Sequence, residues 1–388
     1  MQSSCPVCGS SERDDILSLP QLPVLVNAQV RPDEAPDVAR GDMDLVVCLG
    51  CGHLYNRSFD NDLMDYDAAY ENTLHFSKQF QTFARGLAGR LVDEHGLAGA
   101  TVAELGSGPG HFLSMLCEAG VAEGIGYDPS YDPNRLGAPD HPAVTISTAM
   151  FPADGSLPAK LAFSQHVLEH LHDPVSALAA QREAVAAQEG AVYSEVPNGE
   201  LMLEQCALWD LVYEHLSYFV PTSLRLACTL AGLEPTAVGA DFGGQFLWCE
   251  AVPADGGRDG EADTEAVAAA VAAARAFGVA ATERVASARR DLAAFADEGP
   301  VALWGAGSKG MTYLNLVADV APVAGVVDIN PRKAGWGVPG TDLVISGPEA
   351  MADVRPRTVL VANPVYVDEI SAELSGLGVS ADVRPLWG

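Results

Sequence analysis

The chain has 388 residues, and its 22 Lys and Arg against 52 Asp and Glu give a formal net charge of −30. A length of this order accommodates two or three domains, and the acidic excess argues against binding of nucleic acid or anionic lipid through a basic face. A hydrophobic fraction of 48% with 19% charged residues is typical of a folded protein rather than an acidic disordered chain.

The sequence begins Met-Gln-Ser-Ser-Cys-Pro, without a basic region followed by an apolar one, so a secretory signal is not expected. We also find no uninterrupted apolar stretch of the length that spans a bilayer. We therefore expect a cytoplasmic protein that acts on a small-molecule substrate as a monomer or homodimer, with no nucleic-acid or membrane partner.

Two Cys-x-x-Cys-Gly segments lie near the start of the chain, one with Cys5 and Cys8 and the other with Cys48 and Cys51. Each segment turns two thiolates to one side, and four thiolates suit tetrahedral Zn²⁺ with Zn–S distances of about 2.3 Å. Two disulfides are the alternative, which a reducing compartment disfavours. The sequence therefore predicts a zinc-binding module over residues 1–65, whose closed site is structural rather than catalytic.

Residues 66–255 show the alternation of strands and helices that is typical of a parallel sheet covered by helices. An amphipathic helix comes first, with one apolar face formed by residues at spacings of three and four, around Phe80 to Leu91. Strands are predicted at 101–105, 124–128, 160–164 and 190–197, and helices at 111–119, 175–187 and 223–231.

An alanine-rich stretch and a second α/β unit complete the chain. Residues 253–262 have the composition of a linker, and residues 263–297 predict one long helix or a helical pair. Strands are then expected at 300–304, 323–328 and 358–362, with a helix at 311–318. The fold class is α/β, and we divide the chain into a zinc module (1–65), an α/β domain (66–255), a helical linker (256–298) and a C-terminal Rossmann-like domain (299–388).

The first motif that carries chemistry is Glu-Leu-Gly-Ser-Gly-Pro-Gly, which runs from Glu104 to Gly110 at the end of a predicted strand. Such a glycine-rich turn lets a ligand approach the backbone, and by itself it would suit NAD or S-adenosyl-L-methionine (SAM). Asp128 ends the next strand, where a ribose diol would be bound. The string His-Val-Leu-Glu-His, from His166 to His170, follows a later strand.

Together these segments resemble the class I SAM-dependent methyltransferases. The resemblance implies a Rossmann-like domain in which three glycines border the amino-acid portion of SAM, Asp128 binds the ribose hydroxyls and His166 lies near the cofactor. The cofactor-binding residues are then Glu104, Gly106, Gly108, Gly110, Asp128 and His166. We interpret His170 and His172 as helix-start or surface residues.

The second motif is Tyr-Glu-His-Leu-Ser-Tyr-Phe, from Tyr213 to Phe219. With the four-cysteine module before it and Gly-Ala-Gly-Ser-Lys-Gly after it, the chain resembles the nucleotide-sugar C-methyltransferases of antibiotic deoxysugar pathways over essentially its whole length. Those enzymes usually carry Tyr-His-Glu-His at this point; the first histidine is missing here, which leaves the exact substrate open. The resemblance implies that Glu214 and His215 lie in the active site and that Tyr213 binds substrate.

Methylation of a carbon beside a ketone requires a base, because SAM supplies the activated methyl group and the protein must generate an enolate. Histidine titrates near neutrality, so His215 is a suitable general base, and Glu214 either orients it or holds a sugar hydroxyl. Tyr70 is a candidate to hydrogen-bond the cofactor or the enolate, with simple packing as the alternative. O-methylation of a sugar hydroxyl on the same scaffold is the nearest alternative reaction.

The third motif is Gly-Ala-Gly-Ser-Lys-Gly, from Gly305 to Gly310, and Asp328 ends the next predicted strand. This spacing matches a dinucleotide-binding fingerprint, so an NAD-binding or bifunctional enzyme is a further alternative. The family resemblance instead implies that backbone amides and Lys309 face a nucleotide diphosphate, with Asn363 in the same cleft. The sequence thus predicts a SAM-dependent methyltransferase of a nucleotide-linked ketosugar or a related small polar metabolite.

Overall fold

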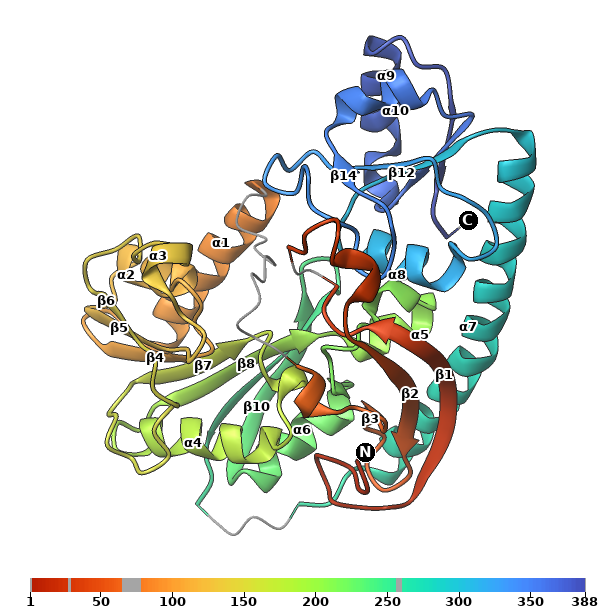
Figure 1. The fold of residues 1–388 in the computed structure, drawn as a ribbon. Coiled ribbons are helices and arrows are strands. Elements are labelled where there is room, and N and C mark those ends of the chain that lie inside the picture. The colour runs from red at the N-terminus through yellow and green to blue at the C-terminus, as the bar shows by residue number, and fades with distance from the viewer. Residues whose placement is uncertain (1, 27–28, 65–77, 256–259, 388) are drawn as a thin grey trace.

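The computed structural model describes residues 2–26, 29–64, 78–255 and 260–387 (Figure 1). Over these ranges the strands form three sheets, of four, seven and five strands. The seven-stranded and five-stranded sheets belong to two α/β units, and the long helix α7 (Thr264–Glu298) connects them in the sequence.

The seven-stranded sheet has the order β10-β11-β8-β7-β4-β5-β6, in which β4 to β8 are parallel and β10 and β11 are antiparallel. The predicted strands are all present in it. The bounds are β4 (Thr101–Leu105), β5 (Glu123–Tyr127), β6 (Val144–Ser147), β7 (Leu161–Gln165), β8 (Ala191–Pro197), β10 (Leu233–Asp241) and β11 (Phe246–Pro253).

Helices cover both faces of this sheet, because successive side chains of a buried parallel strand point to opposite sides. Helices α1 and α2 pack against Val102 and Leu161 on one face, and α4 and α6 pack against Ala103 and Ala162 on the other. The helices of this unit are α1 (Lys78–His95), α2 (His111–Glu118), α3 (Pro133–Leu136), α4 (Pro174–Ala186), α5 (Gly199–Gln205) and α6 (Pro221–Leu230), with the 3-10 helices η4 (Leu168–His170) and η5 (Leu208–Asp210).

The N-terminal sheet is antiparallel in the order β1-β2-β3-β9, and its last strand comes from the second motif. Residues Leu54 and Tyr218 face each other across the pair that joins β3 to β9. The predicted module boundary at residue 65 thus separates segments that share one sheet. The elements are β1 (Arg13–Pro23), η1 (Ala35–Asp37), β2 (Arg40–Cys48), β3 (Leu54–Asn56), η2 (Asn61–Leu63) and β9 (Ser217–Tyr218).

Helix α7 is one uninterrupted helix rather than a helical pair, and it begins at Asp263, whose carboxylate accepts hydrogen bonds from the N–H groups of Glu265 and Ala266. It runs along the outside of the N-terminal sheet in Figure 1, and it packs against β1, α5 and α8. Among the described residues it is the one helix whose length and composition alone would allow it to cross a membrane, with a mean hydropathy of 1.4 over its most apolar window. Helices that pack inside folded proteins also reach this length and this mean hydropathy.

The C-terminal sheet is parallel throughout, in the order β14-β13-β12-β15-β16. Helix α8 begins at Ser308, so Lys309 lies in its first turn and not in the predicted turn before it. The bounds are β12 (Val301–Trp304), α8 (Ser308–Val317), β13 (Gly325–Val327), β14 (Ile345–Ser346), η6 (Pro348–Ala350), α9 (Met351–Val354), β15 (Thr358–Val361), η7 (Pro364–Tyr366), α10 (Val367–Gly376) and β16 (Asp382–Pro385).

Candidate active site

A cavity of about 740 Å³ lies between the two α/β units. Its lining includes residues that follow the carboxyl ends of β4, β7 and β8 in the first unit and of β12, β15 and β16 in the second. Loops at the carboxyl ends of parallel strands are where α/β proteins bind their ligands. The carboxyl-end edges of the two parallel sheets, where ligands bind in such folds, therefore both border this cleft.

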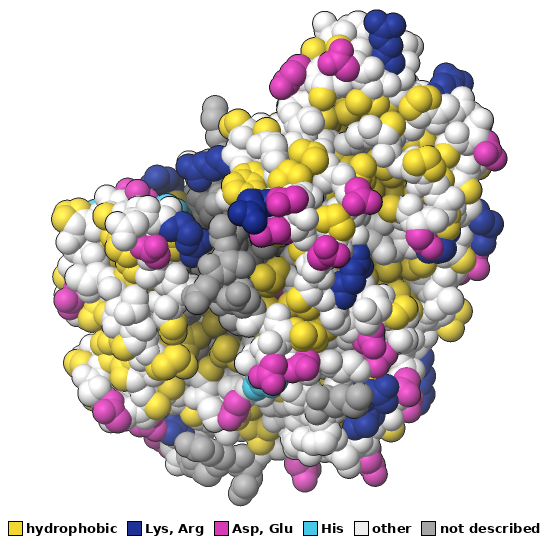
Figure 2. Space-filling view, in the orientation of Figure 1, with side chains coloured by type: hydrophobic (Ala, Val, Ile, Leu, Met, Phe, Trp, Pro, Cys, Tyr) yellow, Lys and Arg dark blue, Asp and Glu magenta, His cyan; other side chains and the backbone are white. Residues whose placement is uncertain are grey.

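Basic side chains lie near this cleft despite the acidic composition. Figure 2 shows Lys and Arg side chains, with Asp and Glu among them, on the face where the two units meet. Arg85, Arg135 and Arg332 line a second cavity of about 630 Å³. Cations near the cleft are thus more numerous than the single Lys309 that the sequence suggested, although the charged residues that line the cleft itself are mainly carboxylates: Glu104, Asp128, Glu169, Glu195, Asp210 and Glu214.

The cofactor end of the cleft is built on the turn between β4 and α2. The N–H of Gly108 donates a hydrogen bond of 2.7 Å to Asp128 Oδ2, which fixes that carboxylate against the turn. Glu104 is buried, one of its oxygens has no hydrogen-bond partner among the described residues, and burial, together with the nearby Asp128, raises its pKa well above the usual value. Gly106 also lines the cavity.

Gly110 differs from the other two glycines of the motif. It does not line the cavity, and it has a φ of 72° at the start of α2. A Cβ atom at Gly110 would lie 3.1 Å from Val144 and 3.3 Å from Ile146. The structure therefore gives this glycine a packing role and does not place it against a cofactor, as the sequence had suggested.

His166 follows β7 with a left-handed backbone, at a φ of 55°. Its ring lies 4.6 Å from that of Phe246, and Nε2 is 3.4 Å from Glu195 Oε1. Burial alone would lower its pKa, but Glu195 and Glu169 reverse the effect and raise it. His166 lines the cavity, as its assignment near the cofactor requires.

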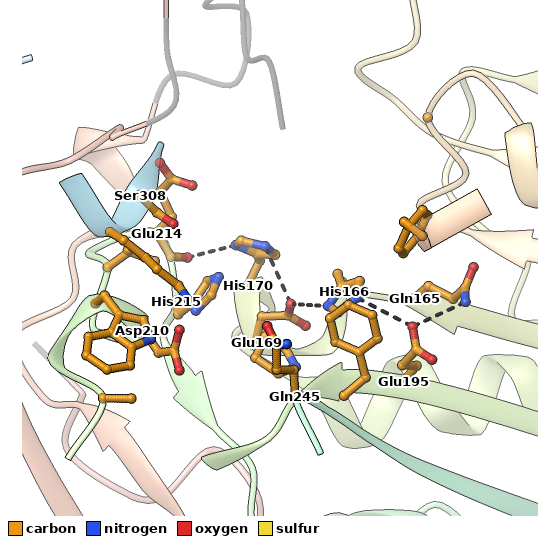
Figure 3. Close-up of a pocket in the computed structure, with 18 of the residues that line it drawn as sticks. Gln165, His166, Glu169, His170, Glu195, Asp210, Glu214, His215, Gln245 and Ser308 are labelled. Atoms are coloured by element: carbon orange, nitrogen blue, oxygen red, sulfur yellow. Dashed lines mark hydrogen bonds and ion pairs between the residues drawn. The ribbon is translucent and has the colours of Figure 1, made fainter. Parts of the chain in front are cut away.

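His215 lies in the middle of the cleft, where the two units meet (Figure 3). Its Nδ1 has no hydrogen-bond partner among the described residues. Burial and the neighbouring His170 and His166 lower its pKa well below the usual value, so the imidazole is neutral near pH 7. A neutral imidazole with a free nitrogen is able to accept a proton from a ligand.

His170 is a site residue that the sequence interpretation missed. Its Nδ1 lies 2.8 Å from the backbone oxygen of Glu214, its ring lies 4.9 Å from that of His215, and it lines the cavity. Its position at the carboxyl end of a parallel strand was the signal that could have identified it. His172 is a surface residue, as expected, with its Nδ1 2.7 Å from Gln2 Nε2.

Glu214 does line the cavity, but its carboxylate is engaged elsewhere. Oε1 accepts a hydrogen bond of 2.8 Å from the N–H of Val26, in the N-terminal segment. The side chain is buried, so it anchors that segment over the cleft. Glu214 and His215 are therefore both at the site, although they point to different partners.

Tyr213 is part of the core and does not line the cavity. Its side chain is fully buried, its ring stacks on Phe59, and its hydroxyl accepts a hydrogen bond of 2.9 Å from the N–H of Asp60. The structure therefore places Tyr213 in the core and does not bring it to the cavity, and its assignment to the substrate stays a prediction. Tyr70 lies outside the described residues.

The second unit contributes Ser308, Lys309 and Asn363 to the cleft. Lys309 Nζ lies 5.2 Å above the ring of Trp209, a cation–π contact. Burial raises the pKa of the adjacent Asp210 to about 6, against the lowering effect of Lys309. The sequence had not singled out Trp209 and Asp210, which both line the cavity.

The dinucleotide fingerprint of the second unit folds as its spacing suggests, but a lysine covers it. The N–H of Ala306 donates a hydrogen bond of 2.7 Å to Asp328 Oδ2. Lys333 Nζ donates to the carbonyl of Ala306 at 2.8 Å and lies 3.8 Å from the same Asp328 oxygen. A ribose diol would have to compete with this lysine, which argues against the NAD alternative.

The four N-terminal cysteines form one cluster. Their sulfur atoms all lie within 4.8 Å of one another, with Cys5 to Cys51 at 3.6 Å and Cys8 to Cys48 at 3.5 Å. A tetrahedron with metal–sulfur distances of about 2.3 Å has similar sulfur separations. A second set, Glu169, His170 and His215, also meets this distance criterion inside the cleft.

Two family models match the chain. One, described as a methyltransferase domain, matches residues 77–238, and the other, described as a C-methyltransferase C-terminal domain, matches residues 258–379. No curated protein that was compared matches the chain.

Solved structures of methyltransferases are similar to part of the chain. A magnesium protoporphyrin IX methyltransferase from Synechocystis PCC 6803 with bound SAH is 17% identical and covers 45% of this chain and 84% of its own, at a TM-score of 0.35. A 1,6-didemethyltoxoflavin-N1-methyltransferase from Burkholderia thailandensis is 16% identical and covers 47% of this chain and 84% of its own, at a TM-score of 0.34. At these scores the likeness carries no argument about substrate.

The first match covers the unit with the glycine-rich turn and Asp128, and the chain is a SAM-dependent methyltransferase. The second match, over residues 258–379, is to a C-terminal domain of C-methyltransferases.

Proposed function

We propose that this methyltransferase adds a methyl group to a carbon beside the ketone of a nucleotide-linked sugar, with His215 as the general base. The observation that carries the proposal is the neutral His215 imidazole, whose Nδ1 has no partner among the described residues, in a cleft that both units line. Asp128 of the first unit and Lys309 of the second line the same cleft.

The residues of the first unit fit SAM. Asp128 is held with its carboxylate at the glycine turn, where it can accept from a ribose diol. The unpaired Glu104 oxygen offers a buried acceptor for a cationic group. When bound, SAM supplies a methyl group on a sulfonium that leaves as a neutral thioether.

The proposed reaction has two steps, removal of a proton and transfer of the methyl group. The carbon–hydrogen bond beside the ketone breaks, the proton goes to His215, and the electron pair forms the enolate. The enolate carbon then bonds to the methyl carbon as the carbon–sulfur bond breaks, and its electron pair stays on sulfur. The protein holds the reacting carbon and the methyl group in line and excludes water.

The second unit supplies groups that suit a diphosphate. Ser308 and Lys309 stand in the first turn of α8, where backbone N–H groups and the helix dipole favour an anion. Asn363 lines the same end of the cavity and can hydrogen-bond a sugar or phosphate oxygen. A nucleotide diphosphate carrying the sugar would thus lie along the cleft towards His215.

The test uses a nucleoside-diphosphate 4-keto-6-deoxyhexose that carries deuterium on the carbon next to the ketone. With SAM, we expect one methyl group per sugar and loss of the deuterium, because C-methylation must break that bond. A methylated product that keeps all its deuterium would establish O-methylation. Tight binding of NAD without binding of SAM would overturn the proposal.

We also propose that the four-cysteine cluster holds a structural zinc ion. Four thiolates leave no open position for a ligand, so chelation should unfold the N-terminal sheet rather than remove a catalytic group. Because β9 of that sheet adjoins His215, we expect activity to fall together with the loss of structure. Loss of turnover with the N-terminal sheet intact by hydrogen exchange would contradict this role.

A further inference from the structure

Glu169 is a buried carboxylate to which nothing above assigns a role. It belongs to η4, its side chain is 1% exposed, and neither of its oxygens has a hydrogen-bond partner among the described residues. An ionisable group left in this state is costly unless another charge compensates it. The groups that lie near the Glu169 carboxylate therefore indicate its role.

Three imidazoles surround the Glu169 carboxylate (Figure 3). Oε1 lies 3.8 Å from Nδ1 of His166 and 3.9 Å from Nε2 of His170. A ring nitrogen of His215 lies within 4.8 Å of both a Glu169 oxygen and a His170 nitrogen. Glu169 is thus the carboxylate that His166, His170 and His215 have in common.

The tautomer of His170 is fixed by its other contact. Because the backbone oxygen of Glu214 accepts at 2.8 Å, His170 Nδ1 must carry a hydrogen. In a neutral ring the lone pair would then lie on Nε2, facing the Glu169 oxygen, and the two would repel each other. One proton placed between them, on Nε2 or on the carboxyl group, removes the repulsion.

Glu195, on the other side of His166, already has hydrogen-bond partners of its own and does not need Glu169. Glu195 Oε1 lies 3.4 Å from His166 Nε2 and accepts from Gln165 Nε2 at 3.2 Å, and its other oxygen accepts from the Tyr193 hydroxyl at 2.9 Å. Glu195 is therefore satisfied by its own neighbours. Glu169 has no such partners and remains available to compensate a charge that appears during the reaction.

We propose that Glu169 is a positioning residue that stabilises the imidazolium formed on His215 when His215 removes the substrate proton. This inference rests on the proposed function, since it takes His215 as the base. Glu214 is not suited to the task, because its Oε1 is bound to the Val26 N–H. After methyl transfer the proton leaves His215 for solvent through the cleft, which His215 itself lines.

The ionisation of the cluster agrees with this assignment. Burial raises the pKa of Glu169, while the nearby His170 and His166 lower it. The pKa of His215 is lowered by burial and by the same two histidines. The groups that face Glu169 are therefore His166, His170 and His215, with Glu195 behind His166.

A histidine titration by NMR tests the proposal without any substrate. Glu169→Gln keeps the shape and removes the charge, so we expect the pKa of His166 to fall by about one to three units, as for an opposite charge removed at this range. Glu250→Gln is the matched control, because Glu250 is a buried carboxylate outside the cavity, paired with Arg90 and His95. Identical titrations of His166 in wild type and Glu169→Gln would overturn the proposal.

Turnover gives the second readout, with SAM and the ketosugar nucleotide of the preceding test. We expect Glu169→Gln to lower kcat about 10- to 100-fold with KM unchanged, as part of the effect of general base catalysis. The acid limb of kcat/KM should move to lower pH, and Glu169→Asp should restore part of kcat. A rise in KM alone, with the pH profile unmoved, would overturn the role.

The turnover assay and the NMR titration test the proposed function and the role of Glu169 separately. If the wild type does not methylate the ketosugar nucleotide, the proposed function fails, while the NMR titration still decides the charge role of Glu169. Metal analysis adds a further check, because Glu169, His170 and His215 could together hold an ion. One zinc per chain in both wild type and Glu169→Gln supports the proposal, whereas a second metal lost in the variant would overturn it.

Discussion

In each α/β unit a backbone N–H of the glycine-rich turn donates a hydrogen bond to the aspartate after the next strand, but the two aspartates differ in their access to the cavity. In the first, Gly108 N–H donates to Asp128 Oδ2, and in the second, Ala306 N–H donates to Asp328 Oδ2, both at 2.7 Å. Asp128 lines the shared cavity, whereas Asp328 does not.

The difference comes from what faces each carboxylate. Asp328 has Lys333 beside it, and that lysine also binds the carbonyl of Ala306. Asp128 has beside it the buried Glu104, one of whose oxygens has no hydrogen-bond partner among the described residues. A strand, a glycine turn and an acid at the right spacing therefore predict the fold of a nucleotide site. The side chains next to the acid decide whether a ligand can bind there.

The largest effect should come from the residue placed between the two units. We expect His215→Ala to lower kcat about 10²- to 10⁴-fold, the usual contribution of a general base, with SAM affinity unchanged. Steady-state kinetics and calorimetric SAM binding check this. A variant that keeps wild-type turnover would remove the base from His215 and, with it, the idea of a shared reaction centre.

The carboxylates of the two units provide the sharpest paired test. Asp128→Ala should weaken SAM binding about 10- to 100-fold, since a charge-assisted hydrogen bond contributes about 1.5–3 kcal/mol. Asp328→Ala is the matched control and should leave SAM binding unchanged. Calorimetry on both variants decides the matter, and equal losses would mean that the two turns are not functionally different.

The lysines of the second unit form the next pair. Lys309→Ala should raise KM for the nucleotide-linked substrate about 10-fold, because it removes a cation from the cleft. Lys333→Ala should change KM by less, since Lys333 binds Asp328 and Ala306 outside the cavity. If Lys333→Ala had the larger effect, the substrate would lie over the fingerprint of the second unit.

The smallest effect concerns pH. The pKa of His215 in the folded protein lies well below its unfolded value of about 6.5, so kcat/KM should stay level as pH falls through 6.5. Below that pH the unfolded chain binds the proton first, so the stabilising contribution of neutral His215 is lost as pH falls. A profile with its midpoint at 6.5 would show an unperturbed base.

Much of the fold followed from sequence patterns, because buried parallel strands and their glycine turns have strong local signals. The strands at 101–105 and 358–361 lie where the apolar runs predict them. The pairing of β9 with β3 could not be predicted, since a two-residue strand has no periodicity. Strands β1 and β10 were missed as well, because prolines and register shifts interrupt their alternation.

The site was predictable where a motif fixed it and not where only tertiary contacts did. Glu104, Asp128 and His215 line the cleft as the motifs indicated. The burial of Tyr213 against Phe59 was not predicted, because that packing depends on a distant segment. His170 was missed for the opposite reason, because the Glu214 carbonyl that holds its ring lies 44 residues away in the sequence.

A crystal structure with SAH and a nucleoside diphosphate tests most directly the division of labour between the two units. We predict SAH at the first turn, with its ribose on Asp128, and the diphosphate at the start of α8, near Ser308 and Lys309. A nucleotide bound at Asp328 after displacement of Lys333, with the first turn empty, would contradict the account.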